Sequence, residues 1–351
     1  IPVLFFVLLE AGLRLGGYGH DYPLFITVTD APGYLQANQE VVRRFVVEET
    51  REPEVAIWPV AFPAHKAPET LRIFVQGGST AAGWPYGFGA SLAGMLQQRL
   101  QASLPQRNIE VISTAMTAVN SYTLMDFADE IIAQQPDAVL IYAGHNEYLG
   151  VLGVGSAVSA GRTRPVVLTY LALSDLRILQ LLKHAYMGLS AQESPAEDRA
   201  HSGPTLMRRI VGEPHIALDS KLYHRGLAQF HDNLTVLLKR YRDAGIPVYI
   251  GTLASNEKDL PPFASLLSER TDVTAWRRHF EKGVAALRRG DTDLAGTSFA
   301  AALALDDGAA SVHFALGRLY ETQSNYSVAR LAYLDARDRD QLRFRAPQSF
   351  N

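Results

Sequence analysis

The chain has 351 residues, of which 47% are hydrophobic and 20% charged, a balance that is typical of globular domains and unlike that of disordered chains. This length allows two domains or one large domain with insertions. The formal charge of -3 gives no general electrostatic reason to bind nucleic acid or acidic lipid, and the lack of cysteine excludes disulfides, thiol nucleophiles and cysteine metal sites.

The first residues of the chain are strongly apolar. An apolar run over residues 1–9 ends at Glu10, and apolar spacing continues through Leu13 and Leu15. This run is too short to cross a bilayer, which takes about 20 residues. We therefore predict that residues 1–16 are the end of a truncated membrane anchor; a buried helix end or a signal-peptide remnant is the alternative.

The pattern then changes twice. Residues 17–70 carry many prolines and aromatics with short alternating stretches such as Val41 to Val47, which predicts an irregular β-rich preamble. Over residues 71–272, short apolar strands alternate with amphipathic helices, which predicts right-handed crossovers and a parallel sheet buried on both faces. The expected strands are 71–75, 109–112, 136–142 and 247–251, and the expected helices are 92–104, 124–133, 165–188 and 218–244.

A period of 34 residues follows, over residues 273–340. Small and aromatic residues recur at this spacing in the pairs Gly283 and Gly317, Asp291 and Asn325, Ala295 and Ala329, Phe299 and Tyr333, and Ala302 and Ala336. Such a period predicts stacked helix pairs, and it resembles the tetratricopeptide repeat. Because two copies are fewer than a free-standing array needs, we expect an inserted or appended helical region that the main domain supports. An ordinary four-helix extension is the alternative, and residues 341–351 are expected to begin the return to the α/β domain.

Three strand ends carry the candidate chemistry. Ser79 follows a pair of glycines directly after the first strand, the second strand ends near Ala115, and Asn146 stands in a Gly-His-Asn-Glu block after the third. The carboxyl ends of parallel strands meet at one edge of a sheet. We therefore expect the Ser79 hydroxyl to face the cleft at this edge. The backbone N–H groups of Ser79 and Ala115 and the side-chain amide of Asn146 could then supply three donors to an oxyanion. The phosphate-loop lysine, the dinucleotide glycine spacing and the nucleophile elbow are absent after the first strand.

These blocks, Gly77-Gly78-Ser79-Thr80, the strand end at Ala115, and Gly144-His145-Asn146-Glu147, resemble the first three sequence blocks of the SGNH/GDSL hydrolase superfamily. They resemble most closely its membrane-anchored members with tetratricopeptide repeats. The resemblance covers roughly residues 70–260, and Leu253–Phe263 is similar to the segment after the fourth strand of that group. It implies a flavodoxin-like α/β fold, with Ser79 as the nucleophile and with Ala115 and Asn146 holding the oxyanion. The family often has glycine where this chain has Ala115.

The base of such a serine comes, in this superfamily, from an Asp-x-x-His motif near the carboxyl end, after the last strand. Of the ten histidines, only His201 has an aspartate, Asp198, three positions earlier. This pair lies between the third and fourth strands, where the family does not place its base. We therefore interpret it as a chance match and expect the true Asp and His to lie beyond Asn351. His145 and Glu147 are expected to support the site or cap a helix.

The resemblance implies a serine esterase that acts on O-acyl esters through an acyl-enzyme. Its substrate would be a small acyl ester or an acylated glycan. An O-acyltransferase with the same nucleophile is the first alternative, and a non-catalytic scaffold that binds a protein partner through the repeats is the second. No metal, cofactor or nucleic-acid partner is implied. With the N-terminal helix in a membrane, the catalytic domain is expected in the periplasm or cell envelope.

Overall fold

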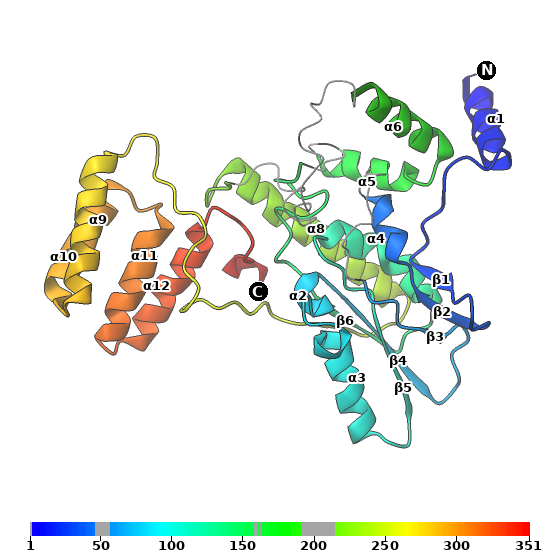
Figure 1. Ribbon diagram of the computed structural model, residues 1–351, viewed down its shortest axis with the longest axis horizontal. Coiled ribbons are helices and arrows are strands. Elements are labelled where there is room, and N and C mark those ends of the chain that lie inside the picture. Colours follow the sequence, from blue (N-terminus) through cyan, green and yellow to red (C-terminus); the bar gives the residue numbers. More distant parts are fainter. Residues whose placement is uncertain (1, 46–56, 158–160, 162, 191–214) are drawn as a thin grey trace.

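Four parallel strands form the central sheet of the α/β region (Figure 1). The computed structural model describes residues 2–45, 57–157, 161, 163–190 and 215–351. In space the strands follow the order β5 (Asn108–Ser113), β4 (Thr70–Gly77), β6 (Ala138–Tyr142) and β7 (Val248–Ile250), and each neighbouring pair is parallel. The chain therefore turns back across the sheet between β4 and β6, as it does in flavodoxin-like sheets. The predicted parallel sheet flanked by helices is confirmed.

Helices cover both faces of this sheet (Figure 1). On one face, the leucines of α3 (Leu92–Ser103) pack against Val75 and Val111. On the other face, α4 (Ser121–Ala133) and α8 (Lys221–Asp243) join Phe74 and Val139 in the main hydrophobic core. The expected burial on both faces holds in the middle of the sheet, where every residue of β4 is buried or half-buried. It does not hold at the edge strand β7, where Tyr249 and Ile250 are 63% and 50% exposed.

A three-stranded antiparallel sheet precedes the parallel one. Its strands are β1 (Phe25–Thr27), β2 (Tyr34–Ala37) and β3 (Phe62–Pro63). The alternating stretch that begins at Val41 is not a strand, because residues Gln39–Arg44 form a 3-10 helix. Arg44 at its end forms ion pairs with Asp126 and Glu130 of α4, so a tertiary contact selects the helical turn. Residues 46 and 47 of that stretch lie outside the described residues.

The helix predicted over 165–188 is broken into α5 (Arg164–Leu173) and α6 (Arg177–Ser190). The start of α6 is capped from far away in the sequence: the carboxylate of Glu10 accepts hydrogen bonds at 3.0 Å from the backbone N–H groups of Arg177 and Ile178. The hydrophobic period within the segment contains no sign of this contact, and for that reason the sequence predicted a single helix.

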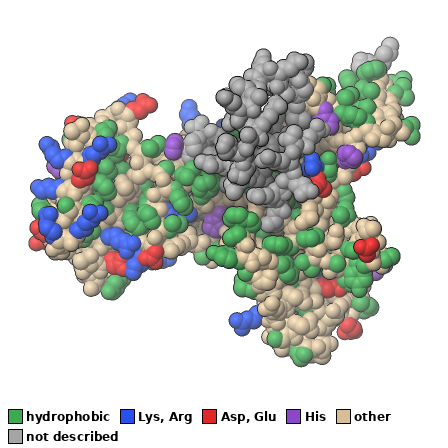
Figure 2. All heavy atoms as spheres, in the orientation of Figure 1, with side chains coloured by type: hydrophobic (Ala, Val, Ile, Leu, Met, Phe, Trp, Pro, Cys, Tyr) green, Lys and Arg blue, Asp and Glu red, His purple; other side chains and the backbone are tan. Residues whose placement is uncertain are grey.

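The N-terminal helix α1 (Pro2–Leu15) carries Glu10 and exposes apolar side chains (Figure 2). Val3, Phe5 and Leu8 are 76%, 60% and 62% exposed. No single helix in the described part of the chain is both long and apolar enough to cross a membrane. The segments Arg164–Leu173 and Arg177–Ala185 meet the length and composition requirement only as a pair, with a bend of 109° between them.

Four helices form two hairpins in the C-terminal region, α9 (Val273–Arg288) with α10 (Thr292–Leu305), and α11 (Ala310–Thr322) with α12 (Tyr326–Arg339). Gly283 lies against the ring of Phe299, and Gly317 lies in the same way against Tyr333: a Cβ on either glycine would be 2.5 Å from a ring carbon. The same spacing separates the two residues whose side-chain oxygens cap α10 and α12, Asp291 and Asn325. The 34-residue period in the sequence therefore reflects the same glycine–ring contact and the same helix cap, each made once in each hairpin.

Replacing Gly283 by alanine should lower the free energy of unfolding by about 1–3 kcal/mol, because the added methyl group overlaps the buried ring of Phe299. Gly296→Ala on α10 is the matched control, since the nearest atom to its new Cβ is 3.6 Å away. That control should raise the free energy of unfolding by about 0.5–1 kcal/mol through helix propensity. Urea denaturation measures both, and equal effects would contradict the tight helix contact.

Candidate active site

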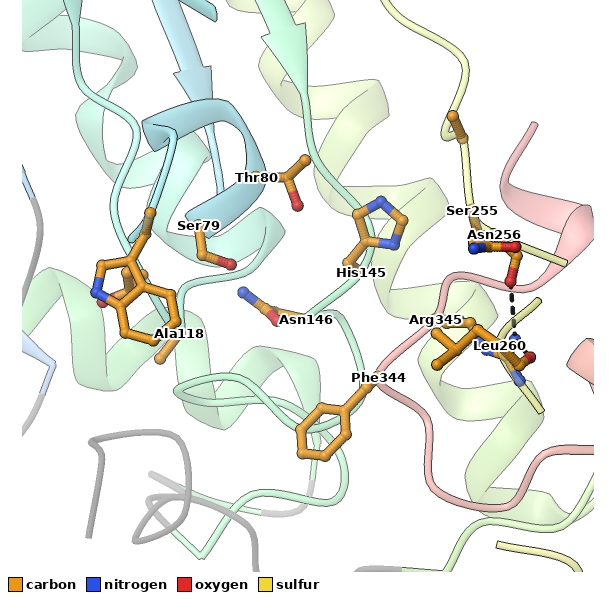
Figure 3. Close-up of a pocket in the computed structure, with 13 residues that line it drawn as sticks. Ser79, Thr80, Ala118, His145, Asn146, Ser255, Asn256, Leu260, Phe344 and Arg345 are labelled. Carbon is orange, nitrogen blue, oxygen red and sulfur yellow. Dashed lines mark hydrogen bonds between the residues drawn. The ribbon is translucent and has the colours of Figure 1, made fainter. Parts of the chain in front are cut away.

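An open pocket of about 410 Å³ lies at the carboxyl edge of the parallel sheet (Figure 3). Residues that follow β4, β5 and β6 form one half of it. The other half comes from the connection between β7 and α9 and from the C-terminal residues Phe344 and Arg345. Because β4 and β6 flank the point where the strand order reverses, the pocket is where open α/β sheets bind their ligands.

Ser79 is the first residue of α2 (Ser79–Ala82), a single helical turn directly after β4. Gly77 allows the chain to pass close to β6, since a Cβ there would overlap the carbonyl oxygen of Tyr142 and lie 2.5 Å from the Cβ of Ala81. Ser79 is half-buried and lines the pocket. Its hydroxyl makes no hydrogen bond to any residue that the structure describes.

The side-chain amide of Asn146 lies beside the backbone that precedes Ser79. A Cβ built on Gly78 would be 3.1 Å from Nδ2 of Asn146, and the Ser79 hydroxyl and the Asn146 amide point toward each other (Figure 3). The backbone of Asn146 is held in its loop by the N–H of Gly150, which donates to its carbonyl oxygen at 2.7 Å. The structure thus brings together two of the three residues that the sequence singled out.

The third, Ala115, does not line the pocket. Ala115 is fully buried, and its N–H donates to Oγ of Ser113 at 3.3 Å. Ala118 lines the pocket instead, with a φ of 60° and with an N–H that donates to no acceptor in the described residues. A left-handed backbone costs alanine roughly 1–2 kcal/mol. Nothing in the sequence marks this residue, because alanine does not indicate a positive φ in the way that glycine does.

His145 lines the pocket between Ser79 and Ser255 (Figure 3). The N–H of Ala346 approaches Nδ1 of His145 at 3.3 Å and donates to it, so in the neutral ring the proton sits on Nε2. Burial, and then the charge of Arg337, lower the pKa of His145 below its usual 6.5. In this tautomer Nε2 has no lone pair with which to accept the Ser79 proton, so His145 is not the general base.

Glu147 ties the loop after β6 to α4 and α8. Its fully buried carboxylate accepts hydrogen bonds from the N–H and the hydroxyl of Ser121, at 3.0 and 2.7 Å, and from Nε2 of Gln229 at 2.5 Å. Burial raises the pKa of Glu147. Because Ser121 begins α4, the expected helix-capping role of Glu147 is confirmed, and the same bonds fix the position of the neighbouring Asn146.

The lowered pKa of His145 predicts a loss of stability in mild acid. Below about pH 6.5 the unfolded chain takes up a proton at this position, whereas the folded chain does so only at lower pH. The free energy of unfolding should therefore fall as the pH drops from 6.5 toward the folded pKa, and level off below it. Chemical denaturation between pH 7.5 and 5 measures the fall, which should be smaller in His145→Gln. An identical pH dependence in both proteins would contradict the burial of this imidazole.

The lining of the pocket, as far as the structure describes it, contains no carboxylate that could orient a catalytic histidine. Asp198 and His201 lie outside the described residues. The described part of the chain also contains no group of three or more His, Asp or Glu side chains that could bind a metal ion.

Neither a protein-family model nor a curated protein matches the chain. Among solved structures, the chain is similar to a lipase/acylhydrolase from Enterococcus faecalis, with 15% sequence identity, coverage of 50% of this chain and 74% of that chain, and a TM-score of 0.23. The function is therefore inferred from the pocket itself.

Proposed function

We propose that the protein is a serine esterase of the SGNH/GDSL kind that acts on O-acyl esters in the cell envelope. One observation carries the proposal: the Ser79 hydroxyl and the Asn146 amide face each other in an open pocket at the switch point of a parallel sheet. The apolar, exposed α1 supports the further proposal that a membrane anchor holds the enzyme at the envelope.

In the proposed reaction, Oγ of Ser79 attacks the ester carbonyl carbon, and the carbonyl oxygen becomes an oxyanion. The Asn146 amide and the backbone N–H groups of Ser79 and Ala118 are the donors for that oxyanion. No described group accepts a hydrogen bond from any of the three, so they are free to stabilise the charge as it develops. The alcohol then leaves, and water hydrolyses the acyl-serine.

The Ser79 proton requires a base, which in such enzymes is a histidine oriented by a carboxylate. The tautomer of His145 does not supply this base. We propose that the Asp and His of an Asp-x-x-His motif outside the described residues complete the site.

Labelling with a fluorophosphonate tests the proposal on the protein in its natural full length. The expected result is a covalent adduct on Ser79, located by peptide mass spectrometry, and turnover of 4-nitrophenyl acetate. Ser79→Ala should lose both, whereas Ser255→Ala, which changes a serine in the other half of the pocket, should keep both. An adduct on another residue, or turnover that survives Ser79→Ala, would overturn the proposal.

The products separate esterase from the alternatives. With an isotopically labelled acyl donor, free acid indicates hydrolysis, and an acylated sugar hydroxyl indicates O-acyl transfer. An inert Ser79 combined with capture of a protein partner that depends on residues 273–340 would indicate the scaffold role, which the repeated contacts between α9 and α10 and between α11 and α12 favour.

A further inference from the structure

We propose that His145 binds the alcohol part of the ester, that its Nε2–H donates a hydrogen bond to an oxygen of that alcohol, and that the alcohol is a neutral sugar or polyol. The proposal rests on the proposed function, because it assigns the substrate class of the same pocket. It follows from three features: the state of the imidazole, its place in the pocket, and the groups beside it.

The first feature is the fixed orientation of the imidazole. The N–H of Ala346 occupies Nδ1, and the ring packs edge-on against Tyr142 with centroids 6.1 Å apart. Nε2 therefore carries the proton and makes no hydrogen bond to a described residue. This nitrogen is also not fully enclosed by the protein. An N–H donor in this state is open to whatever occupies the pocket.

The second feature is the position of the ring. Ser79, Asn146 and Ala118 lie on one side of His145, and Ser255, Asn256 and Arg345 lie on the other (Figure 3). The first side holds the reacting carbonyl group and its oxyanion. The second side is then left for the part of the ester that departs or is exchanged, and His145 stands at the boundary between the two.

The third feature is the chemistry of the second side. Asn256 uses its Oδ1 to accept the N–H of Asp259 at 2.8 Å, which leaves its NH₂ group without an acceptor in the described residues. Together with Nε2–H of His145, the open groups on this side are donors, and they match a ligand rich in oxygen acceptors. Hydroxyl and ether oxygens of a sugar or polyol are such acceptors.

The charge of Arg345 does not make this side an anion site. Its Nη2 forms an ion pair at 3.0 Å with Asp340, which is 2% exposed, and its Nη1 donates at 2.9 Å to the carbonyl oxygen of Leu260. The guanidinium is therefore neutralised within the protein. A neutral alcohol fits this balance better than a carboxylate or a phosphate, whose charge would be left without a partner.

Binding to the Ser79→Ala protein, which does not consume the probe, tests the proposal. With ¹⁵N-labelled histidine, the free protein should show His145 with Nδ1 unprotonated, and 6-O-acetylglucose should shift its Nε2 signal. His145→Leu should weaken binding of 6-O-acetylglucose about tenfold, because it removes one hydrogen bond to the ligand. His145→Gln, which keeps an N–H donor, should restore most of the affinity, and His231→Leu, at an exposed histidine on α8, should change nothing.

Propyl acetate, whose alcohol has no further oxygen, separates recognition of the alcohol from general damage to the pocket. Its binding should be the same in the His145→Leu protein as in the parent. Equal losses for both esters, an Nδ1-protonated ring, or tighter binding of an acetylated sugar acid than of 6-O-acetylglucose would each overturn the proposal. A His145 that responds to the sugar ester while Ser79 stays inert toward fluorophosphonate would leave this binding site standing and remove the esterase.

Discussion

Replacing Asn146 by alanine should lower kcat for 4-nitrophenyl acetate by about 10²–10³-fold in the natural full-length protein, with little change in KM. The Asn146 amide lies next to Gly78 and points toward the Ser79 hydroxyl, beside which the proposed reaction would place the oxyanion. A donor that meets its acceptor only in the tetrahedral intermediate stabilises the transition state and not the bound ester, so the loss appears in kcat.

Gln106→Ala is the matched control, because it removes an exposed amide in the turn between α3 and β5, outside the pocket. With the small nitrophenyl ester it should leave kcat unchanged. Stopped-flow measurement of the nitrophenolate burst and of the steady state would locate the Asn146 defect in acylation. A loss of similar size in both variants, or a loss confined to KM, would contradict the oxyanion role.

Replacing Arg72 by alanine should lower the free energy of unfolding by about 3–5 kcal/mol. Arg72 on β4 is 1% exposed; it forms an ion pair with Glu110 of β5 at 2.7 Å and donates to the carbonyl oxygens of Gln134 and Pro63. Its loss leaves the Glu110 carboxylate, which is 10% exposed, without its ion-pair partner. It also removes the donor that links β3 to the parallel sheet.

Two further proteins separate the ion pair from the loss of bulk. Arg99→Ala, at an exposed position on α3, should change the free energy of unfolding by less than about 0.5 kcal/mol. The double change Arg72→Met and Glu110→Met should cost less than Arg72→Ala alone, since both charges are removed together. Guanidinium denaturation measures all three, and a double variant as unstable as the single one would show that packing, and not charge, dominates at Arg72.

The juxtaposition of Ser79 and Asn146 was predictable because it depends on strand direction. Both residues follow strands of one parallel sheet, so both had to reach the same edge. The choice between Ala115 and Ala118 was not predictable, since it depends on the φ of 60° at Ala118 and on the hydrogen bond between Ala115 and Ser113. Neither feature is visible in the sequence, since both positions are alanine.

The state of His145 was hidden for a related reason. Its tautomer is set by the N–H of Ala346, which is 201 positions away. The break between α5 and α6 is similar, because the carboxylate that caps α6 comes from Glu10. Contacts of this kind join segments that are far apart in the sequence, and the hydrophobic pattern within each segment does not indicate the contact.

The sequence by itself determined the parallel sheet and its flanking helices, the 34-residue helix pairs, and the strand ends that carry Ser79 and Asn146. It did so because the burial of an element leaves a period of apolar residues along the chain. The tertiary structure alone decided which of the two alanines lines the pocket, which nitrogen of His145 holds the proton, and where the long helix breaks. The first outcome depends on one backbone torsion angle and one local hydrogen bond, and the other two depend on hydrogen bonds between segments far apart in the chain. None of these features produces a repeating pattern of residue types along the sequence.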